Sequence, residues 1–432
     1  MRIVIIGSGF GGLACGRLLA EAGHQVLVLE QHWQPGGCLQ SYKRRGLAFD
    51  TGLHYVGGLA EGQPMHDVFS RLGLMHLPWH RLDSDGFDQI TIQGRTFRLA
   101  EGFEQFVNTL ANDFPHQREA LQRYADMLQA PDPAPTVNAW QWLNETFSDP
   151  LLIDVLSGSC LKTELRRESL PLLAFAHSQK NFIESSWRLQ GDSSLIVNSL
   201  VGDIRRMGGE VICRADVNEL TEHDGRITTA HCSNGECYEA DIFISDIHPS
   251  QTFEMIKESR VLKNIFRRRI GMLENTRGIY THSLVLKPGM LPYFNHNKYV
   301  YPETDIWREH APGVMLSCRV PEKGGNYATI LDLLTPGSDD PMPMAETVIP
   351  GLRDMVSERY VSTPQTWQRF TRTPNGSAYG IRKDCRQPLF TMLSPRTPIA
   401  NLLLTGQNVM LHGLEGVAMT ALQTVGELRG ES

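Results

Sequence analysis

Residues 1–30 read MRIVIIGSGFGGLACGRLLAEAGHQVLVLE, and this stretch decides the fold. A β-branched run over residues 2–6 ends at a Gly-x-Gly-x-x-Gly turn, and apolar residues then return at helical spacing until Gly23. A second strand is expected over residues 25–29. In such a turn the first glycine makes the bend, the second lets pyrophosphate approach the backbone, and the third lets helix and strand pack closely. The stretch predicts a Rossmann-type βαβ unit with a nucleotide-binding turn at Gly7, Gly9, Phe10, Gly11 and Gly12.

An acidic residue, Glu30, stands at the end of the second expected strand. A carboxylate at that point takes a ribose 2′-hydroxyl, while the start of the helix offers N–H groups and a positive dipole to the phosphates. Gln31 and His32 follow Glu30, so this stretch holds no arginine for a 2′-phosphate, and NADP is disfavoured. The turn alone does not separate NAD from FAD.

The composition is that of a folded globular protein. Of 432 residues 41% are apolar and 21% are charged, and at roughly 100 to 200 residues per domain two or three domains are expected. A net charge of -7 offers no attraction to nucleic acid. The eight cysteines lack the spacing of a metal site, so no metal is expected, and we interpret them as reduced thiols of a cytoplasmic protein. No run of about 18 to 20 apolar residues predicts a spanning helix.

Residues from about 102 to 190 show helical periodicity in several pieces, which a proline-rich loop at residues 131–135 interrupts. A helix is expected from residue 194, and a last one over 416–428. Between them a lobe rich in strands is expected, with one helix over 342–361. The expected strands are 210–217, 240–245, 281–286, 314–320, 327–333 and 401–404.

A second glycine pair at Gly36 and Gly37 and a late Thr405-Gly406-Gln407 turn accompany the first turn. With them the chain resembles the FAD-dependent oxidoreductases of the amine oxidase and carotenoid desaturase superfamily. The resemblance implies FAD, and it departs from many members in Gln34 and Gln407, which replace charged residues. It implies a cofactor site that adds the following residues to the first turn: Glu30, Gln31, Gly36, Gly37, Cys38, Val217, Gly406, Gln407, Gly416, Val417 and Ala418.

Three further stretches, at residues 49–58, 376–380 and 406–413, resemble phytoene desaturases, carotenoid isomerases and especially the retinol saturase branch. The resemblance implies hydride exchange between a flavin and a C–C or C=C bond of an apolar polyene or isoprenoid lipid. The direction of the reaction stays open between desaturation, saturation and isomerisation.

The fold expected from this resemblance is α/β, with a discontinuous Rossmann-type FAD-binding domain and an inserted α+β substrate domain. We assign residues 1–100, 190–260 and 372–432 to the FAD-binding domain. Residues 101–189 and 261–371 form the substrate-binding or cap domain.

Three side chains are the preferred acid–base candidates because they stand beside the expected flavin segments: His54, Tyr379 and His412. The alternative for each histidine is a structural, hydrogen-bonded role, and for Tyr379 it is a place in the core. Cys38 is more simply an inert buried thiol than a reactive one.

No second dinucleotide turn occurs, so electrons are expected to pass to or from a quinone, oxygen or a separate redox protein. A membrane-dissolved polyene favours peripheral contact with the inner face of the membrane. An apolar stripe between Trp140 and Ile153 is one candidate for an entry surface, against the simpler interpretation as helix core.

Two alternatives remain. An amine or amino-acid oxidase shares the superfamily, and Rab GDP dissociation inhibitors share the architecture while binding prenyl chains without flavin. The intact glycine set argues against the second alternative.

Overall fold

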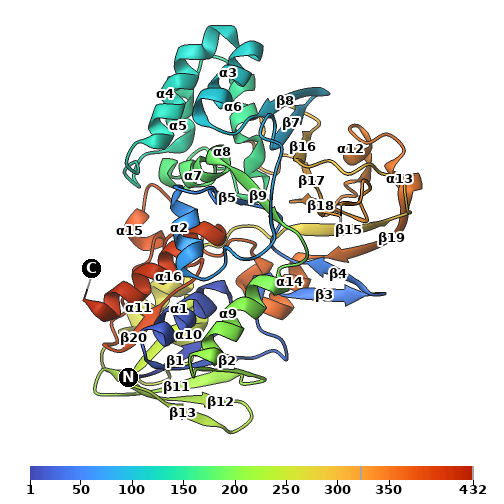
Figure 1. Cartoon of the computed structure of the whole chain (residues 1–432). Coiled ribbons are helices and arrows are strands. Elements are labelled where there is room, and N and C mark those ends of the chain that lie inside the picture. The colour runs from blue at the N-terminus through green and yellow to red at the C-terminus, as the bar shows by residue number, and fades with distance from the viewer. Residues whose placement is uncertain (322–323, 431–432) are drawn as a thin grey trace.

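The first sheet of the molecule carries the glycine turn quoted above. The computed structural model describes residues 1–321 and 324–430 (Figure 1). Five parallel strands lie in the order β10-β2-β1-β14-β20. Helix α1 connects β1 to β2 and packs against both α9 and α16. The bounds are β1 (Arg2–Ile6), α1 (Phe10–Glu21), β2 (Gln25–Glu30), α9 (Ser194–Arg206), β10 (Glu210–Cys213), β14 (Ile242–Ser245), β20 (Leu402–Leu404) and α16 (Gly413–Arg429).

Strand β1 is buried on both faces, as the β-branched run predicts. Ile3 and Ile5 pack into a cluster with α1, α9 and α16, whereas Val4 and Ile6 pack into a second cluster on the opposite face. A sheet covered on both sides leaves its strand ends as the open edge at which a ligand can bind.

The second sheet has seven strands in the order β19-β15-β18-β17-β16-β7-β8. Its pairs are antiparallel except for the parallel pair β16 and β7. The bounds are β7 (Asp88–Ile92), β8 (Arg95–Leu99), β15 (Tyr280–Leu286), β16 (Asn297–Tyr301), β17 (Val314–Cys318), β18 (Ile330–Thr335) and β19 (Val356–Ser362).

Residues 88–99 therefore belong to the second sheet, although they fall within the expected FAD-binding range 1–100. Nothing in the local sequence marks this membership, because the partner strand β16 lies far along the chain. The remaining expected domain boundaries stay predictions, and residues 322, 323, 431 and 432 lie outside the described part of the chain.

A group of helices covers one face of the second sheet, at the top of Figure 1. Its bounds are α3 (Phe103–Asp113), η2 (Pro115–Gln117), α4 (Arg118–Gln129), α5 (Ala139–Thr146), α6 (Pro150–Ser157), η3 (Gly158–Lys162), α7 (Leu172–His177) and α8 (Lys180–Glu184). The apolar stripe between Trp140 and Ile153 lies in this core: Leu143, Phe147, Leu152 and Ile153 are buried, and Trp140, Trp142 and Leu151 pack against them. The stripe is helix core and not an exposed entry surface.

Two expected elements are wrong. Residues 342–361 form two short helices, α12 (Met342–Glu346) and α13 (Leu352–Met355), followed by strand β19, which pairs with β15 at the sheet edge. The expected strand 210–217 ends at Cys213, because Arg214 is left-handed with φ 62°. The chain then enters a separate sheet of β11 (Val217–His223), β12 (Arg226–Cys232) and β13 (Cys237–Glu239).

Smaller elements connect the two main sheets. They are η1 (Gly37–Leu39), β3 (Ser41–Arg44), β4 (Leu47–Asp50), β5 (Val56–Gly57), α2 (Pro64–Arg71), β6 (Trp79–Arg81), β9 (Ser186–Leu189), α10 (Pro249–Glu254), α11 (Asn264–Gly271), α14 (Pro364–Thr371), η5 (Pro374–Gly376) and α15 (Pro388–Thr391). Among residues 1–321 and 324–430, none of the helices has the length and apolar character needed to span a bilayer.

Candidate active site

One cavity of about 300 Å³ runs from the end of the first sheet towards the second sheet. At one end the glycine turn and the ends of β1, β2 and β14 line it. At the other end it is lined by Tyr55, Phe182, Ile279, Leu334 and Ala378, which are largely apolar. The cavity thus joins a nucleotide end to a substrate end.

The nucleotide end depends on glycine for steric reasons. Gly7 is left-handed with φ 97°, and a β-carbon on Gly12 would lie 2.2 Å from the carbonyl oxygen of Gly7. The backbone N–H of Gly7 donates to the carbonyl of Leu29 at 2.9 Å, and this bond connects the turn to β2. No side chain fits at Gly12, so the helix N-terminus stands close against the turn and presents its N–H groups to the cavity.

The second glycine pair packs on the first turn. Gly36 and Gly37 are both left-handed, with φ 124° and 54°, and the N–H of Gly36 donates to the carbonyl of Ser8 at 3.0 Å. A β-carbon on Gly37 would lie 3.0 Å from the α-carbon of Gly9. The pair therefore packs against the first turn through backbone atoms.

Glu30 is buried at the rim of this wall and lines the cavity. One carboxylate oxygen accepts from the N–H and hydroxyl of Ser8, and the other accepts from the N–H of His32 at 2.8 Å. Its position at the end of β2 matches that expected for a group that binds a ribose.

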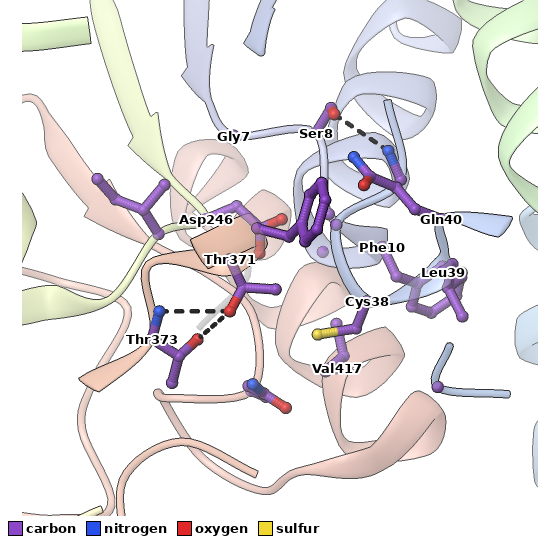
Figure 2. Close-up of a pocket in the computed structure, with 18 of the residues that line it drawn as sticks. Gly7, Ser8, Phe10, Cys38, Leu39, Gln40, Asp246, Thr371, Thr373 and Val417 are labelled. Atoms are coloured by element: carbon purple, nitrogen blue, oxygen red, sulfur yellow. Dashed lines mark hydrogen bonds between the residues drawn. The ribbon is translucent and has the colours of Figure 1, made fainter. Parts of the chain in front are cut away.

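Asp246, at the end of β14, is the central residue that the sequence interpretation missed (Figure 2). Its carboxylate accepts from the backbone N–H groups of Gly12 and Gly9, and β-carbons on Gly9 and Gly11 would each lie 2.5 Å from its oxygens. Burial raises the pKa of Asp246 to about 7, and Glu30 adds to the rise. A strand end facing a glycine turn was the available signal.

The C-terminal segment approaches the same point. Gly406 is left-handed with φ 87°, and a β-carbon on it would lie 2.3 Å from an Asp246 oxygen. Gln407 and Val417 line the cavity, as does Cys38 beside Val417. Of the expected cofactor residues, those in the cavity wall are Gly7, Gly9, Phe10, Gly11, Glu30, Gln31, Gly36, Gly37, Cys38, Val217, Gln407 and Val417.

Four expected cofactor residues stand behind that wall: Gly12, Gly406, Gly416 and Ala418. Gly12 and Gly406 allow the close approaches described above. A β-carbon on Gly416 would lie 2.6 Å from the carbonyl of Leu411, and Ala418 is fully buried in the core beside α1. These residues shape the wall by packing.

Helix α14 and the residues after it border the nucleotide end from the second lobe. Gln31 and His32 both bond the carbonyl of Phe370, at 3.3 and 3.0 Å. Arg372, which the sequence interpretation missed, lines the cavity and pairs with both oxygens of Asp216 at 2.7 and 2.8 Å. An arginine thus lies near the expected ribose acid, but Asp216 already holds its guanidinium.

The three acid–base candidates occupy different places. His54 is buried and lines the main cavity, and it also borders a second, small cavity of about 20 Å³. Tyr379 lines the main cavity, and its ring lies 4.5 Å from that of His412, centroid to centroid. His412 stands behind Tyr379, and burial lowers its pKa to about 4, with Lys383 adding to the effect. At neutral pH its imidazole is uncharged.

Comparisons with known proteins agree with this geometry. A family model described as an NAD(P)-binding Rossmann-like domain matches residues 5–72. All-trans-retinol 13,14-reductase of Danio rerio is 24% identical over 98% of this chain and 85% of its own length. A prolycopene isomerase of an Oncidium hybrid is 20% identical over 94% and 79%, and phytoene desaturase of Pantoea ananas is 23% identical over 98% of both chains.

Over nearly its whole length the chain is similar to proteins of the carotenoid desaturase and retinol saturase family. Its fold is also that of a solved putrescine oxidase variant, with a TM-score of 0.68, 16% identity and coverage of 100% of this chain and 99% of the other. The expected Rossmann-type fold class is confirmed. The match to an NAD(P)-binding Rossmann-like domain indicates a dinucleotide or flavin cofactor for this chain.

Cys38 lines the cavity, and Cys15 is buried in the core beside it. Burial raises the pKa of the Cys38 thiol to about 12, and that of Cys15 to the same range. No group of three or more metal-ligating side chains occurs within residues 1–321 and 324–430.

Proposed function

We propose that this protein is a flavin-dependent oxidoreductase acting on a C–C or C=C bond of a polyene or isoprenoid lipid. The observation that carries the proposal is the single cavity with a glycine-lined nucleotide end and a largely apolar substrate end. Relatives named for reduction, desaturation and isomerisation of polyenes support the same assignment.

The cofactor that we propose is FAD. Its support is the fit of the wall: side chains are excluded at Gly7, Gly12 and Gly37, so the backbone of the turn is open to the close approach of phosphates. Glu30 would hold a ribose hydroxyl, and Gln407 and Val417 would contact the ring end of the cofactor. When bound, a flavin supplies hydride acceptance or donation at one ring nitrogen.

The protein's own residues do the rest. The apolar walls at Phe182, Ile279 and Leu334 exclude water and orient an extended chain. His54, Tyr379 and His412 remain our proposed acid–base set, although the low pKa of His412 suits an acceptor that holds its proton only at acid pH. Electron exchange with a quinone, oxygen or a redox protein, and contact with the cytoplasmic face of a membrane, complete the proposal.

The test is conversion of polyenes by the purified yellow protein, with the product mass measured. Loss of two hydrogens, gain of two, or an isomer of unchanged mass identifies desaturation, saturation or isomerisation. No conversion of any polyene would refute the proposal. Bleaching of the flavin by simple amines would favour the amine oxidase alternative, and a colourless protein that binds prenyl chains would favour the GDP dissociation inhibitor type.

A further inference from the structure

A row of polar side chains crosses the second sheet beneath the cavity. The strand register places Asp88 beside Asn297, Asn297 beside Ser317, Ser317 beside Asp332, and Asp332 beside Ser283. All five are buried. The next row on the same face, two residues along each strand, is Ile90, Tyr299, Met315, Leu334 and Thr281, of which three are apolar. Burying a polar group costs free energy unless the group is hydrogen-bonded, so we examined the partners of each side chain in this row.

Tyr55 connects this row to the cavity. It lines the cavity, its ring packs on Phe182 at 4.5 Å between centroids, and its hydroxyl donates to Oδ2 of Asp88 at 2.9 Å. The hydroxyl oxygen of Tyr55 lies 2.9 Å from the hydroxyl oxygen of Tyr299. Since the Tyr55 proton is directed at Asp88, the Tyr299 hydroxyl must donate to the Tyr55 oxygen.

The neighbours of Asn297 fix its direction, and with it the surroundings of Asp88. Oδ1 of Asn297 accepts from Arg188 at 2.7 Å and from Ser317 at 3.0 Å. Its Nδ2 must therefore face Asp88, to which it donates at 2.8 Å. Asp88 thus receives donors on both oxygens, with Tyr55 on the side of the cavity.

We propose that Tyr55 is a catalytic residue that exchanges a proton with the polyene, and that Asp88 takes up or returns the proton of Tyr55. The inference rests on the proposed function. The two titratable groups are joined by a direct hydrogen bond, and one of them, Tyr55, lines the cavity.

Two proton transfers are coupled in this proposal. In desaturation a C–H bond of the polyene breaks, its proton passes to the Tyr55 oxygen, and the O–H proton of Tyr55 passes to Oδ2 of Asp88. A flavin bound in the cavity would accept the hydride from the adjacent carbon. In saturation each movement is reversed. Burial and Asp88 raise the pKa of Tyr55 well above its usual value, so a phenolate does not form, and the paired shift avoids one.

The test uses the flavin-loaded protein and three probes taken from the substrates of its relatives: all-trans-retinol, prolycopene and phytoene. The variants are Tyr55→Phe and Asp88→Asn, with Asp88→Glu as the variant that keeps a carboxyl. The matched control is Tyr301→Phe on the same strand as Tyr299, whose buried hydroxyl donates to the carbonyl of Gly158 instead.

We expect Tyr55→Phe and Asp88→Asn each to slow conversion by about 100-fold or more, the usual scale of general acid–base catalysis. Flavin content and the Kd for the polyene, from quenching of protein fluorescence, should stay within about threefold of the parent, because no apolar contact is lost. Asp88→Glu should recover at least about tenfold over Asp88→Asn, and Tyr301→Phe should convert at nearly the parent rate.

Conversion by Tyr55→Phe or Asp88→Asn within threefold of the control would overturn the pair. So would a loss of flavin or polyene binding that matches the loss of conversion, since the residues would then be structural. If the parent protein itself converts none of the three probes, the proposed function has failed, and the two failures are therefore distinguishable.

Discussion

The two ends of the cavity are built by different means. At the nucleotide end the wall is backbone: glycines at Gly7, Gly12 and Gly37 leave room where any β-carbon would collide or strain. At the substrate end the wall is made by side chains, and behind it the register of β7 and β16 brings together the polar side chains of Asp88 and Asn297. We therefore expect flavin binding at the nucleotide end to be lost when a glycine gains a side chain. Around the substrate end we expect stability to fall when a buried charged group loses its partner.

The charges at the two ends differ as well. Asp246 faces helix N–H groups at the nucleotide end, where a phosphate would need the same donors. Behind the substrate end Arg319 stands between Asp50, at 3.3 Å, and Asp332, at 3.9 Å. Substitutions at the two ends should therefore have different effects on flavin binding and on stability.

The largest expected effect is at the glycine turn. Gly9→Val should abolish flavin retention, because even its β-carbon would lie 2.5 Å from Asp246 and its branch would enter the space for pyrophosphate. The measurement is flavin absorbance per protein after gel filtration. Gly202→Ala, on the exposed side of α9 with nothing within 4 Å of the new β-carbon, is the control and should keep its flavin. A Gly9→Val protein that keeps its flavin would show that the glycine turn tolerates added side-chain volume.

The second prediction concerns the charged end. Arg319→Met should lower the free energy of unfolding by about 3 to 5 kcal/mol, the cost of leaving buried carboxylates without their partner. Both Asp50 and Asp332 are buried. Urea unfolding at pH 7 measures the loss. Arg98→Met removes an exposed pair with Asp85 and should change stability by less than about 0.5 kcal/mol. Equal effects of the two substitutions would show that the buried charges contribute little.

The third prediction is a pH dependence at the nucleotide end. The Asp246 pKa is raised to about 7 in the folded protein, so the folded state binds this proton more tightly than the unfolded state. The flavin-free protein should therefore lose stability as the pH rises from about 4 to about 7. Asp246→Asn should remove that slope and gain roughly 1 to 3 kcal/mol at pH 8.

Thermal melts of the flavin-free protein between pH 4 and pH 8 measure this slope. The exposed Asp126→Asn variant on α4 is the control and should follow the parent curve. A slope that survives in Asp246→Asn would mean that another group titrates.

The smallest expected effect is on the rate at which Cys38 is alkylated. Burial raises the pKa of Cys38 to about 12, so only a minute fraction is thiolate at pH 8. Iodoacetamide should modify the exposed Cys237 well before Cys38. Peptide mass spectrometry over time ranks the two. Early labelling of Cys38 would show that the nucleotide end opens readily in solution.

Local sequence predicted much of the first sheet and its turn. The strand 2–6, the helix after Gly9 and the strand from residue 25 all appear, because each depends on neighbours within a few residues. The expectation failed where pairing is distant: residues 356–362 form the edge strand β19, and residues 88–99 join the second sheet. Helical spacing cannot report a partner that far along the chain.

The candidate site divides in the same way. The sequence alone located the glycine turn, the acidic residue Glu30 at the end of a strand and a second glycine pair, since these features are encoded in residues close together in the chain. Only the tertiary structure decided that Asp246 faces the turn, that Arg372 pairs with Asp216, and that Tyr55 meets Asp88. Those contacts join segments far apart in the chain, and strand register and packing, which no local pattern carries, set them.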